Sequence, residues 1–297
     1  MEFTAPPAFA ATSYRISTIT VTGGVNTEVD LGELFRRLSA HPRGEIQYIE
    51  YGMNKHDLQT SGTNKRTQRA SKKKPPEEKK KRFDNQLTVV FHLDQNHYNM
   101  KLFKNGNVQI TGVKQIDNGR KAIDFLIDTL KELHAVEESP PPPPLLHRSD
   151  DIANVSYRVR LINSDFRVNF EIRLDRLYQV VTREYDIMCS YEPCIYPGAK
   201  IEYYYPNNGR CICEGMCNGK GAECKKITIA VFQSGCVIIT GANCVEHIEA
   251  AYSFVCTMMR ENISTIFRHR IKPMGSSLKP VPPPPMASTD APLAAPC

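Results

Sequence analysis

Tryptophan is absent from this chain of 297 residues, and no apolar run approaches the roughly 18 to 20 residues that a membrane span needs. The opening residues, MEFTAPPAFAATS, lack a basic start and a long apolar stretch, so we expect no signal peptide. No cysteine precedes Cys189, and all ten cysteines lie there or later. A secreted disulfide scaffold is usually small and spreads its cysteines. We therefore expect an intracellular monomer without membrane contact, whose thiols are reduced or bind metal.

Catalytic machinery is missing as well. The sequence contains no Gly-rich phosphate loop and no pairing of a nucleophile with a base. The stretch HLDQNH holds His92, Asp94 and His97, but strand alternation places the first two on one face and His97 near a turn. We predict that the protein is not an enzyme.

The positive charge is confined to one segment. The whole chain carries +6, whereas residues 65–82 contain ten Lys or Arg and two Glu, which is +8 and leaves −2 for the remainder. Such a run indicates a polyanionic partner or a nuclear address, and a solvated loop without a partner is the alternative. Its densest part consists of Lys72, Lys73, Lys74, Lys79, Lys80, Lys81 and Arg82.

The chain repeats itself. KLFKNGNVQITGV at 101–113 aligns without a gap with AVFQSGCVIITGA at 230–242, an offset of 129. SYRI at 13–16 matches SYRV at 156–159, an offset of 143. Each copy shows a strand, an amphipathic helix, four strands and a long helix in that order. Two such copies predict an α+β protein with helices on one face of an antiparallel sheet.

The other face of this sheet is expected to be uncovered. Alternation along the strands places matched pairs of side chains there, namely Gln109 with Ile238, Thr111 with Thr240 and Phe103 with Phe232. Exposed apolar side chains at repeated positions indicate a binding surface. A covering loop or an oligomer is the alternative.

Several motifs resemble the TATA-box-binding protein family. FEIRLDRL, SYEPCIYPG and VFQSGCVIITGA are similar to its second repeat, and KRF and LFKNGNVQITGVK to its first. The resemblance covers residues 12–138 and 152–265, and it is greatest to the TATA-binding-protein-like factors of large DNA viruses. It implies two repeats that form a pseudo-twofold saddle, with a curved antiparallel sheet and helices on the convex face. It also implies binding to double-stranded DNA, a TFIIB-like initiation factor and RNA polymerase.

The family's functional positions fall on specific residues. Aromatic wedges that kink DNA correspond to Phe83, Phe103, Tyr196 and Phe232. Contacts to the groove or to phosphates correspond to Lys101, Gln109, Thr111, Lys114, Ile238 and Thr240. Glu192 matches a glutamate that contacts the TFIIB-type factor in the family, and a solvated turn carboxylate is the alternative reading.

The chain also departs from the family pattern. A tyrosine stands at wedge position 196, and Asn107, Cys236 and Asn243 replace flanking lysines. Family arginines appear as His92 and Glu202, and first-strand asparagines as Tyr14 and as Tyr157 or Leu161. These changes argue against ordinary TATA selectivity. The basic run, which lies just before Phe83, offers phosphate contacts or a nuclear signal in their place.

A cysteine cluster suggests a metal site. Cys211, Cys213, Cys217 and Cys224 can bind one structural Zn²⁺, with free thiols and disulfides as alternatives; no cofactor is otherwise required. We expect five segments along the chain: a flexible N-terminus 1–11, a first repeat 12–138 with a basic insertion 56–82, a proline-rich linker 139–151, a second repeat 152–265 with a Cys-rich insertion 207–226, and a disordered tail 266–297.

The leading functional hypothesis is a transcription initiation factor that bends promoter DNA through its minor groove. A second is a sequence-nonspecific architectural or virion nucleoprotein, and a third is a protein-docking platform. An enzyme accessory is disfavoured because no catalytic domain remains outside the repeats. The resemblance implies a location in a host nucleus or a cytoplasmic viral factory, with packaging in the virion as a further option.

Overall fold

The computed structural model describes residues 5–58, 85–137, 139–147, 152–206 and 224–269. All of its helices and strands lie in one compact unit, Pro6–Arg268. Phe83, the basic run and Cys211, Cys213 and Cys217 lie outside the described residues. Within the described part, none of the helices is both long and apolar enough to span a membrane.

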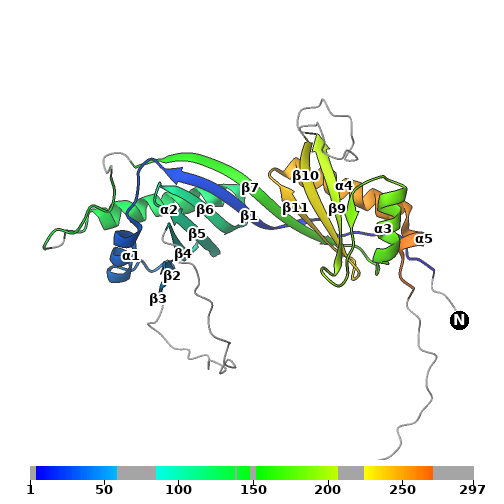
Figure 1. Cartoon of the computed structure of the whole chain (residues 1–297), viewed down its shortest axis with the longest axis horizontal. Helices are drawn as coiled ribbons and strands as arrows, with labels where there is room; N and C mark the ends of the chain where they lie inside the picture. Colours follow the sequence, from blue (N-terminus) through cyan, green and yellow to red (C-terminus); the bar gives the residue numbers. More distant parts are fainter. Residues whose placement is uncertain (1–4, 59–84, 138, 148–151, 207–223, 270–297) are drawn as a thin grey trace, which may run out of the picture. The chain divides into compact units, whose positions relative to one another are not determined.

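The elements follow the predicted order (Figure 1). They are β1 (Arg15–Val25), α1 (Leu31–Ala40), β2 (Ile46–Tyr51), β3 (Asn54–Asp57), β4 (Gln86–Leu93), β5 (Asn96–Phe103), β6 (Asn107–Val113), α2 (Ile116–His134), β7 (Asn154–Arg167), α3 (Leu174–Arg183), β8 (Cys189–Ser190), β9 (Gly198–Pro206), β10 (Cys224–Phe232), β11 (Cys236–Ala242), α4 (Val245–Glu261) and α5 (Ile263–Ile266). The strand β3 was not predicted, and it pairs with β2 at one edge.

The helices form where the apolar periodicity predicts them. The side chain of Asp30 caps α1 by accepting a hydrogen bond of 2.9 Å from the backbone N–H of Glu33. In α3 the buried face consists of Leu174, Leu177, Val180 and Val181, whereas Tyr178 is 40% exposed. The packing therefore buries Val180 and leaves the ring of Tyr178 partly in solvent.

All the described strands belong to one eleven-stranded sheet in the order β3-β2-β4-β5-β6-β1-β7-β11-β10-β9-β8. Apart from the extra β3, this order is symmetrical about the central antiparallel pair β1–β7. The register is symmetrical as well, because Ile19 pairs with Ile162, its own equivalent at the offset of 143. At the same offset Arg15 corresponds to Arg158 and Thr22 to Asp165. The pair Arg15–Asp165 is therefore the equivalent of the pair Thr22–Arg158. Such pairing places an approximate twofold axis between the two central strands.

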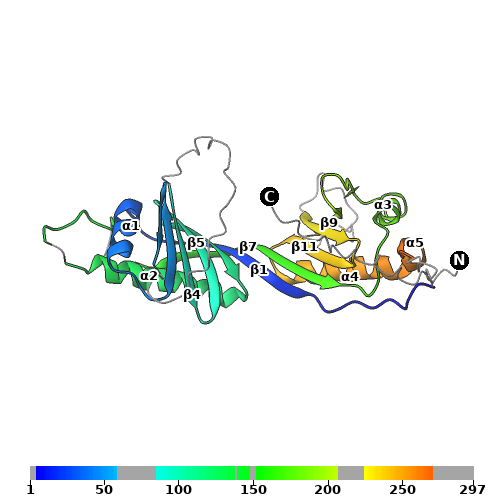
Figure 2. The ribbon, with the colours of Figure 1, turned by 90° about the horizontal axis from the view of Figure 1, so that it is seen from below.

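One face of the sheet carries the hydrophobic core. The long helix α2 packs against β1, β6 and β7, and α4 packs against β9, β10 and β11 (Figures 1 and 2). Strand residues directed to these helices are fully buried, as Ile110 and Ile239 illustrate, while their neighbours Thr111 and Thr240 are half-buried. The alternation expected from the sequence is therefore present, and a second sheet face lies opposite the helices.

The N-terminal segment is more ordered than the sequence suggested. Residues 8–11 were expected to be flexible, but the backbone N–H of Ala10 donates a hydrogen bond of 3.0 Å to Oδ1 of Asn169. Phe9 packs edge-on against Phe170, with ring centroids 6.3 Å apart, and lies under the guanidinium of Arg260. This segment is thereby attached to the second half of the sheet.

The disordered tail was expected to begin at residue 266, but Ile266 is fully buried at the end of α5, and the backbone N–H of Arg268 donates to the carbonyl of Glu171.

Two further boundaries shift as well. In the proline-rich linker Leu145 and Leu146 are buried, and the backbone N–H of Asp30 donates to the carbonyl of Leu145. The Cys-rich insertion was expected to extend to residue 226, but Cys224 already belongs to β10 and pairs with Pro206. The linker therefore packs on the first half, and the insertion begins and ends at the paired ends of two strands.

Candidate nucleic-acid interface

Two aromatic rings meet at one end of the uncovered face. Tyr196 and Phe232 lie with their ring centroids 5.7 Å apart, and both are half-buried. Tyr196 comes from the turn before β9 and Phe232 from the last position of β10. The ammonium of Lys200 lies 4.0 Å from the centre of the Tyr196 ring, on the side chain's π face. The structure thus brings together two residues that the sequence assigned to one wedge.

Gly198 permits this close approach. It pairs with Phe232 across β9 and β10. A methyl group at its Cα would lie 3.0 Å from Cε1 of Tyr196 and 3.1 Å from Cε1 of Phe232. A side chain at this position would require both rings to give way by a few tenths of an ångström, and glycine avoids this.

Phe103 occupies the matched place in the first half. It ends β5 as Phe232 ends β10, and it pairs with Gln86 of β4. The hairpin turns after both residues contain a glycine at φ +79°, Gly106 and Gly235, which L side chains rarely adopt. Two strand ends of the same geometry therefore present the two phenylalanines.

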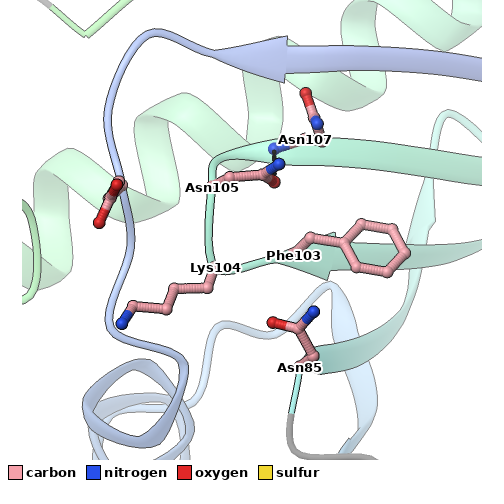
Figure 3. Close-up of a pocket in the computed structure, with 6 residues that line it drawn as sticks. Asn85, Phe103, Lys104, Asn105 and Asn107 are labelled. Carbon is pink, nitrogen blue, oxygen red and sulfur yellow. Dashed lines mark hydrogen bonds between the residues drawn. The ribbon is translucent and has the colours of Figure 1, made fainter.

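A pocket of about 520 Å³ lies beside Phe103. In Figure 3 the Phe103 ring points away from Lys104, while Asn85 lies at the end of the neighbouring strand. The remaining lining residues are Glu28, Asn105 and Asn107. The ring partner predicted for Phe103, Phe83, lies outside the described residues, so the first wedge is seen here only in part.

The two matched threonines have different partners. Thr240 donates a hydrogen bond of 2.6 Å from Oγ1 to the amide oxygen of Asn163 on β7. Thr111 is near the backbone carbonyl of Asn99, at 3.4 Å from Oγ1. Lys114, expected at the groove, instead donates to the carbonyl of Ser17 on β1. Its ammonium is therefore engaged at the centre of the sheet.

Glu202 is neutralised where the family resemblance implies an arginine. The ammonium of Lys226 donates to Glu202 Oε1, and the hydroxyl of Tyr204 donates to Oε2 at 2.9 Å. The hydrogen bond from Lys226 is the main cause that lowers the pKa of Glu202, so the carboxylate stays ionised. The Glu202–Lys226 pair therefore adds one anion and one cation, and so no net charge, to this face.

The first-strand assignments need correction. Tyr14, which the sequence placed at a groove position, packs against Tyr252 of α4 and donates to Glu249. Tyr157 donates to the carbonyl of Ile116 and so faces α2. Of the predicted alternatives, Leu161 lies on the uncovered face, where it pairs with Thr20.

Of the four residues at the centre of the uncovered face, only Leu161 was predicted; Thr18, Thr20 and Asn163 were missed. Thr18 pairs with Asn163, next to the pair of Thr20 with Leu161. All four are half-buried, and they lie on either side of the twofold axis. Alternation outward from Ile19 and Ile162 could have found them, because every second residue of a strand shares a face.

Glu192 lies in a tight turn. Its carbonyl accepts hydrogen bonds of 2.9 Å from the backbone N–H groups of Ile195 and Tyr196, and its side chain is exposed. Ile195 is 80% exposed at the same turn. The turn therefore offers a carboxylate and an apolar side chain to the outside, next to the aromatic pair.

The proposed zinc site is outside what the structure describes, except for Cys224. Among the described residues, no group of three His, Cys, Asp or Glu side chains is placed to hold a metal ion. Cys224 marks the base of the insertion that carries the other three cysteines. The metal hypothesis remains a prediction.

Comparison with known proteins identifies the class. Residues 70–133 and 156–262 match the family model described as transcription factor TFIID, or TATA-binding protein. A protein of Acanthamoeba polyphaga mimivirus described as TATA-box-binding protein-like is 29% identical over 245 residues, which are 81% of this chain and 63% of that protein. The solved TATA-binding protein of Methanococcus jannaschii is 17% identical with a TM-score of 0.46, over 84% of this chain and 99% of that one.

The chain belongs to the TATA-binding-protein family, because the family model matches more than half of its residues. The resemblance predicted from the motifs is therefore confirmed. The chain spans about 63% of the length of the mimivirus relative, so its particular activity and partners are matters for proposal.

Proposed function

We propose that this protein is a non-enzymatic initiation factor that binds promoter DNA through the minor groove and bends it. In this proposal the uncovered face forms the concave side of a pseudo-twofold saddle. The aromatic pair Tyr196–Phe232 enters one base step, and Phe103 with Phe83 enters another. The pairing of Tyr196 with Phe232 is the observation that carries the proposal.

Physical chemistry supports this use of the face. Apolar rings inserted between base steps partly unstack them and kink the duplex, and the TATA-binding protein is itself a standard example of this mechanism. The rings here lie at strand ends on the face that no helix covers. The central positions between them are small or uncharged, namely Thr18, Thr20, Leu161 and Asn163. A groove floor can approach such a surface closely.

The test is a bending measurement on end-labelled duplexes. An A·T-rich TATA element and a scrambled duplex of equal length are compared across a salt series, with the wild type and with Phe103→Ala/Phe232→Ala. We expect tight, bent and selective binding by the wild type, and loss of the bend in the variant. Equal, unbent binding of both duplexes that the substitutions do not change would contradict the proposal.

A second candidate function is sequence-nonspecific packaging of DNA. The observation in its favour is the charge of +8 within residues 65–82, because phosphate contacts supply affinity without base readout. This function predicts steep salt dependence, no preference between the two duplexes, and loss of binding when that segment is removed. A role as a protein-docking platform would leave no measurable affinity for either duplex.

We further propose that Glu192 contacts a TFIIB-like factor, which then recruits RNA polymerase. The exposed turn that carries Glu192 and Ile195 supports this assignment. Glu192→Ala should weaken assembly of the factor on preformed DNA complexes while leaving bending unchanged. A variant that assembles normally would return Glu192 to the role of a solvated turn residue.

Zinc and location are separate proposals. Four thiolates from Cys211, Cys213, Cys217 and Cys224 would hold one structural Zn²⁺ at the base of the β9–β10 insertion. Metal content after purification, compared with a variant carrying serine at all four positions, tests this site. A protein free of zinc with all ten thiols titratable would contradict it. The basic run and the viral relative support a host nucleus or a viral factory as the location.

A further inference from the structure

We propose that the two halves of the uncovered face read different base pairs: the first half accommodates G·C pairs, and the second half requires A·T pairs. This inference rests on the proposed minor-groove function. It follows from two rows of side chains that occupy equivalent places in the sheet but differ in chemistry.

The first row is polar from strand to strand. Thr22 of β1 pairs with Gln109 of β6, Gln109 pairs with Lys101 of β5, and Lys101 pairs with Thr88 of β4. Directly paired residues of neighbouring strands share a face. At the central end, Arg160 Nε donates a hydrogen bond of 2.8 Å to the hydroxyl of Thr22.

The polar groups of this row are available to a ligand. Gln109 and Lys101 are half-buried. Within the described part of the chain, neither side chain makes a hydrogen bond or an ion pair. A glutamine offers both a carbonyl oxygen and an amide N–H, and a lysine offers three N–H donors.

The equivalent row of the second half is apolar at its two middle positions. Asp165 of β7 pairs with Ile238 of β11, and Ile238 pairs with Ala230 of β10. Ile238 stands where the first row has Gln109, and Ala230 where it has Lys101, both at the offset of 129. Ala230 is 5% exposed and does not belong to the contiguous hydrophobic core on the helix side of the sheet.

Minor-groove chemistry distinguishes the two rows. A·T and T·A pairs display only acceptors in the minor groove, whereas a G·C pair adds the guanine N2 amino group, a donor. The carbonyl of Gln109 can accept from that amino group, and Lys101 can donate to the groove acceptors. Ile238 and Ala230 offer no acceptor, and Oδ1 of the neighbouring Asp165 already accepts a hydrogen bond of 2.7 Å from Arg15. An amino group over the two middle positions would therefore be buried without a partner, which costs free energy. The second half therefore rejects G·C pairs and the first half does not.

The experiment uses a palindromic A·T element and two derivatives. In the first derivative, a single A·T pair in one half of the element is replaced by G·C. In the second derivative, the symmetry-related A·T pair in the other half is replaced as well. Both derivatives are made for each base-pair position of the half in turn. The protein can turn to place the altered half against its first row, so the element need not be oriented. We expect the single replacement to be tolerated within a few-fold. The double replacement should weaken binding by about 10- to 100-fold, as expected for a mismatched pair.

A reciprocal pair of variants provides the matched control. In Gln109→Ile, replacing a single pair by G·C should weaken DNA binding as much as replacing the second pair weakens binding by the wild type. Ile238→Gln should restore binding of the doubly replaced duplex. Thermal unfolding of both variants, compared with that of the wild type, checks that neither change disturbs the fold.

Three outcomes separate the hypotheses. The inference is supported if the wild type tolerates one G·C replacement, if Gln109→Ile loses this tolerance, and if Ile238→Gln also tolerates the second replacement. Bent binding of the A·T element with equal penalties for the first and second replacement overturns the inference while the proposed function stands. If the A·T element is not bent at all, the proposed function fails, and the inference fails with it.

Discussion

At the scale of single residues, the aromatic pair on the uncovered face depends on how closely its side chains can approach the backbone and one another. The Tyr196–Phe232 pair exists because Gly198 leaves room for two rings beside its Cα. Lys200 covers the face of the Tyr196 ring at 4.0 Å, which adds a favourable cation–π contact. The hydroxyl of Tyr196 is a departure from a purely apolar wedge, because a buried hydroxyl needs a partner.

Gly198→Ala should displace both rings. The added methyl would lie 3.0 Å from Tyr196 and 3.1 Å from Phe232, so both rings must shift by a few tenths of an ångström. Overpacking of this kind costs about 1 to 3 kcal/mol. We expect a lower free energy of unfolding, measured with urea, and a reduced bend of A·T-rich DNA.

Gly44→Ala is the matched control, because nothing lies within 4 Å of the position of its added methyl. It should change neither stability nor bending appreciably. If Gly198→Ala bends DNA as the wild type does, the ring pair does not act as a wedge in the observed geometry.

At the scale of elements, a buried charge network fastens the proline-rich linker to the first half. Arg37 is 3% exposed and donates from Nε to Glu33 at 2.6 Å. Its other nitrogens donate to the carbonyls of Leu133, at the end of α2, and of Pro143 in the linker, at 2.6 and 3.1 Å. One guanidinium therefore ties α1, α2 and the linker together.

Arg37→Met should destabilise the protein strongly. The substitution removes the guanidinium and leaves two backbone carbonyls and the Glu33 carboxylate short of partners, a loss of about 3 to 5 kcal/mol for a broken buried pair. Arg36→Met is the control, because Arg36 binds the same carboxylate from a side chain that is 44% exposed. Its loss should cost under about 1 kcal/mol. Urea unfolding of the two variants measures the difference, and equal losses would contradict the network.

Acid should weaken the same network. The hydrogen bond from Arg36, followed by that from Arg37, outweighs the effect of burial and lowers the pKa of Glu33 to about 2. The usual glutamate pKa in an unfolded chain is about 4.3. A carboxyl whose pKa is depressed on folding contributes stability above the unfolded value, and this contribution fades as the pH falls toward the folded value.

The comparison of wild type with Glu33→Gln measures this contribution. The free energy of unfolding should differ most near pH 6, and the difference should narrow between about pH 4 and pH 2. A difference that stays constant across this range would mean that Glu33 does not titrate with the pKa given by its arginine partners.

At the scale of the whole molecule, symmetry and charge are distributed differently. The strand order and the β1–β7 register are nearly twofold, yet the residues at equivalent places differ, as Gln109 and Ile238 do. The charge is more unequal still, because residues 65–82 carry +8 and have no counterpart in the second half. A symmetrical framework thus carries an unsymmetrical surface.

Replacing residues 65–82 by a neutral segment of equal length should flatten the salt dependence of DNA binding. Each phosphate contact contributes about −0.9 to the slope of log K against log salt. We expect a slope shallower by several units while the bend of a bound duplex persists. An unchanged slope, measured over the same salt series, would mean that the basic run serves as a nuclear signal or a solvated segment.

The sequence by itself determined the local features. The repeat at offset 129, the apolar stripes of α2 and α4 and the turn before β9 follow from short-range periodicity and backbone preferences, and the family follows from the motifs. For the same reason the order of the elements along each repeat and the equivalence of Phe103 and Phe232 could be predicted.

The tertiary structure alone decided how distant segments pair. Tyr14 turns to α4, Arg37 reaches Pro143, and residues 8–11 attach to the second half through contacts more than one hundred residues apart in the chain. The cross-sheet rows from Thr22 to Thr88 and from Asp165 to Ala230 likewise depend on the register between strands. Alternation fixes which face a residue takes within one strand, but only long-range hydrogen bonding fixes what stands beside it.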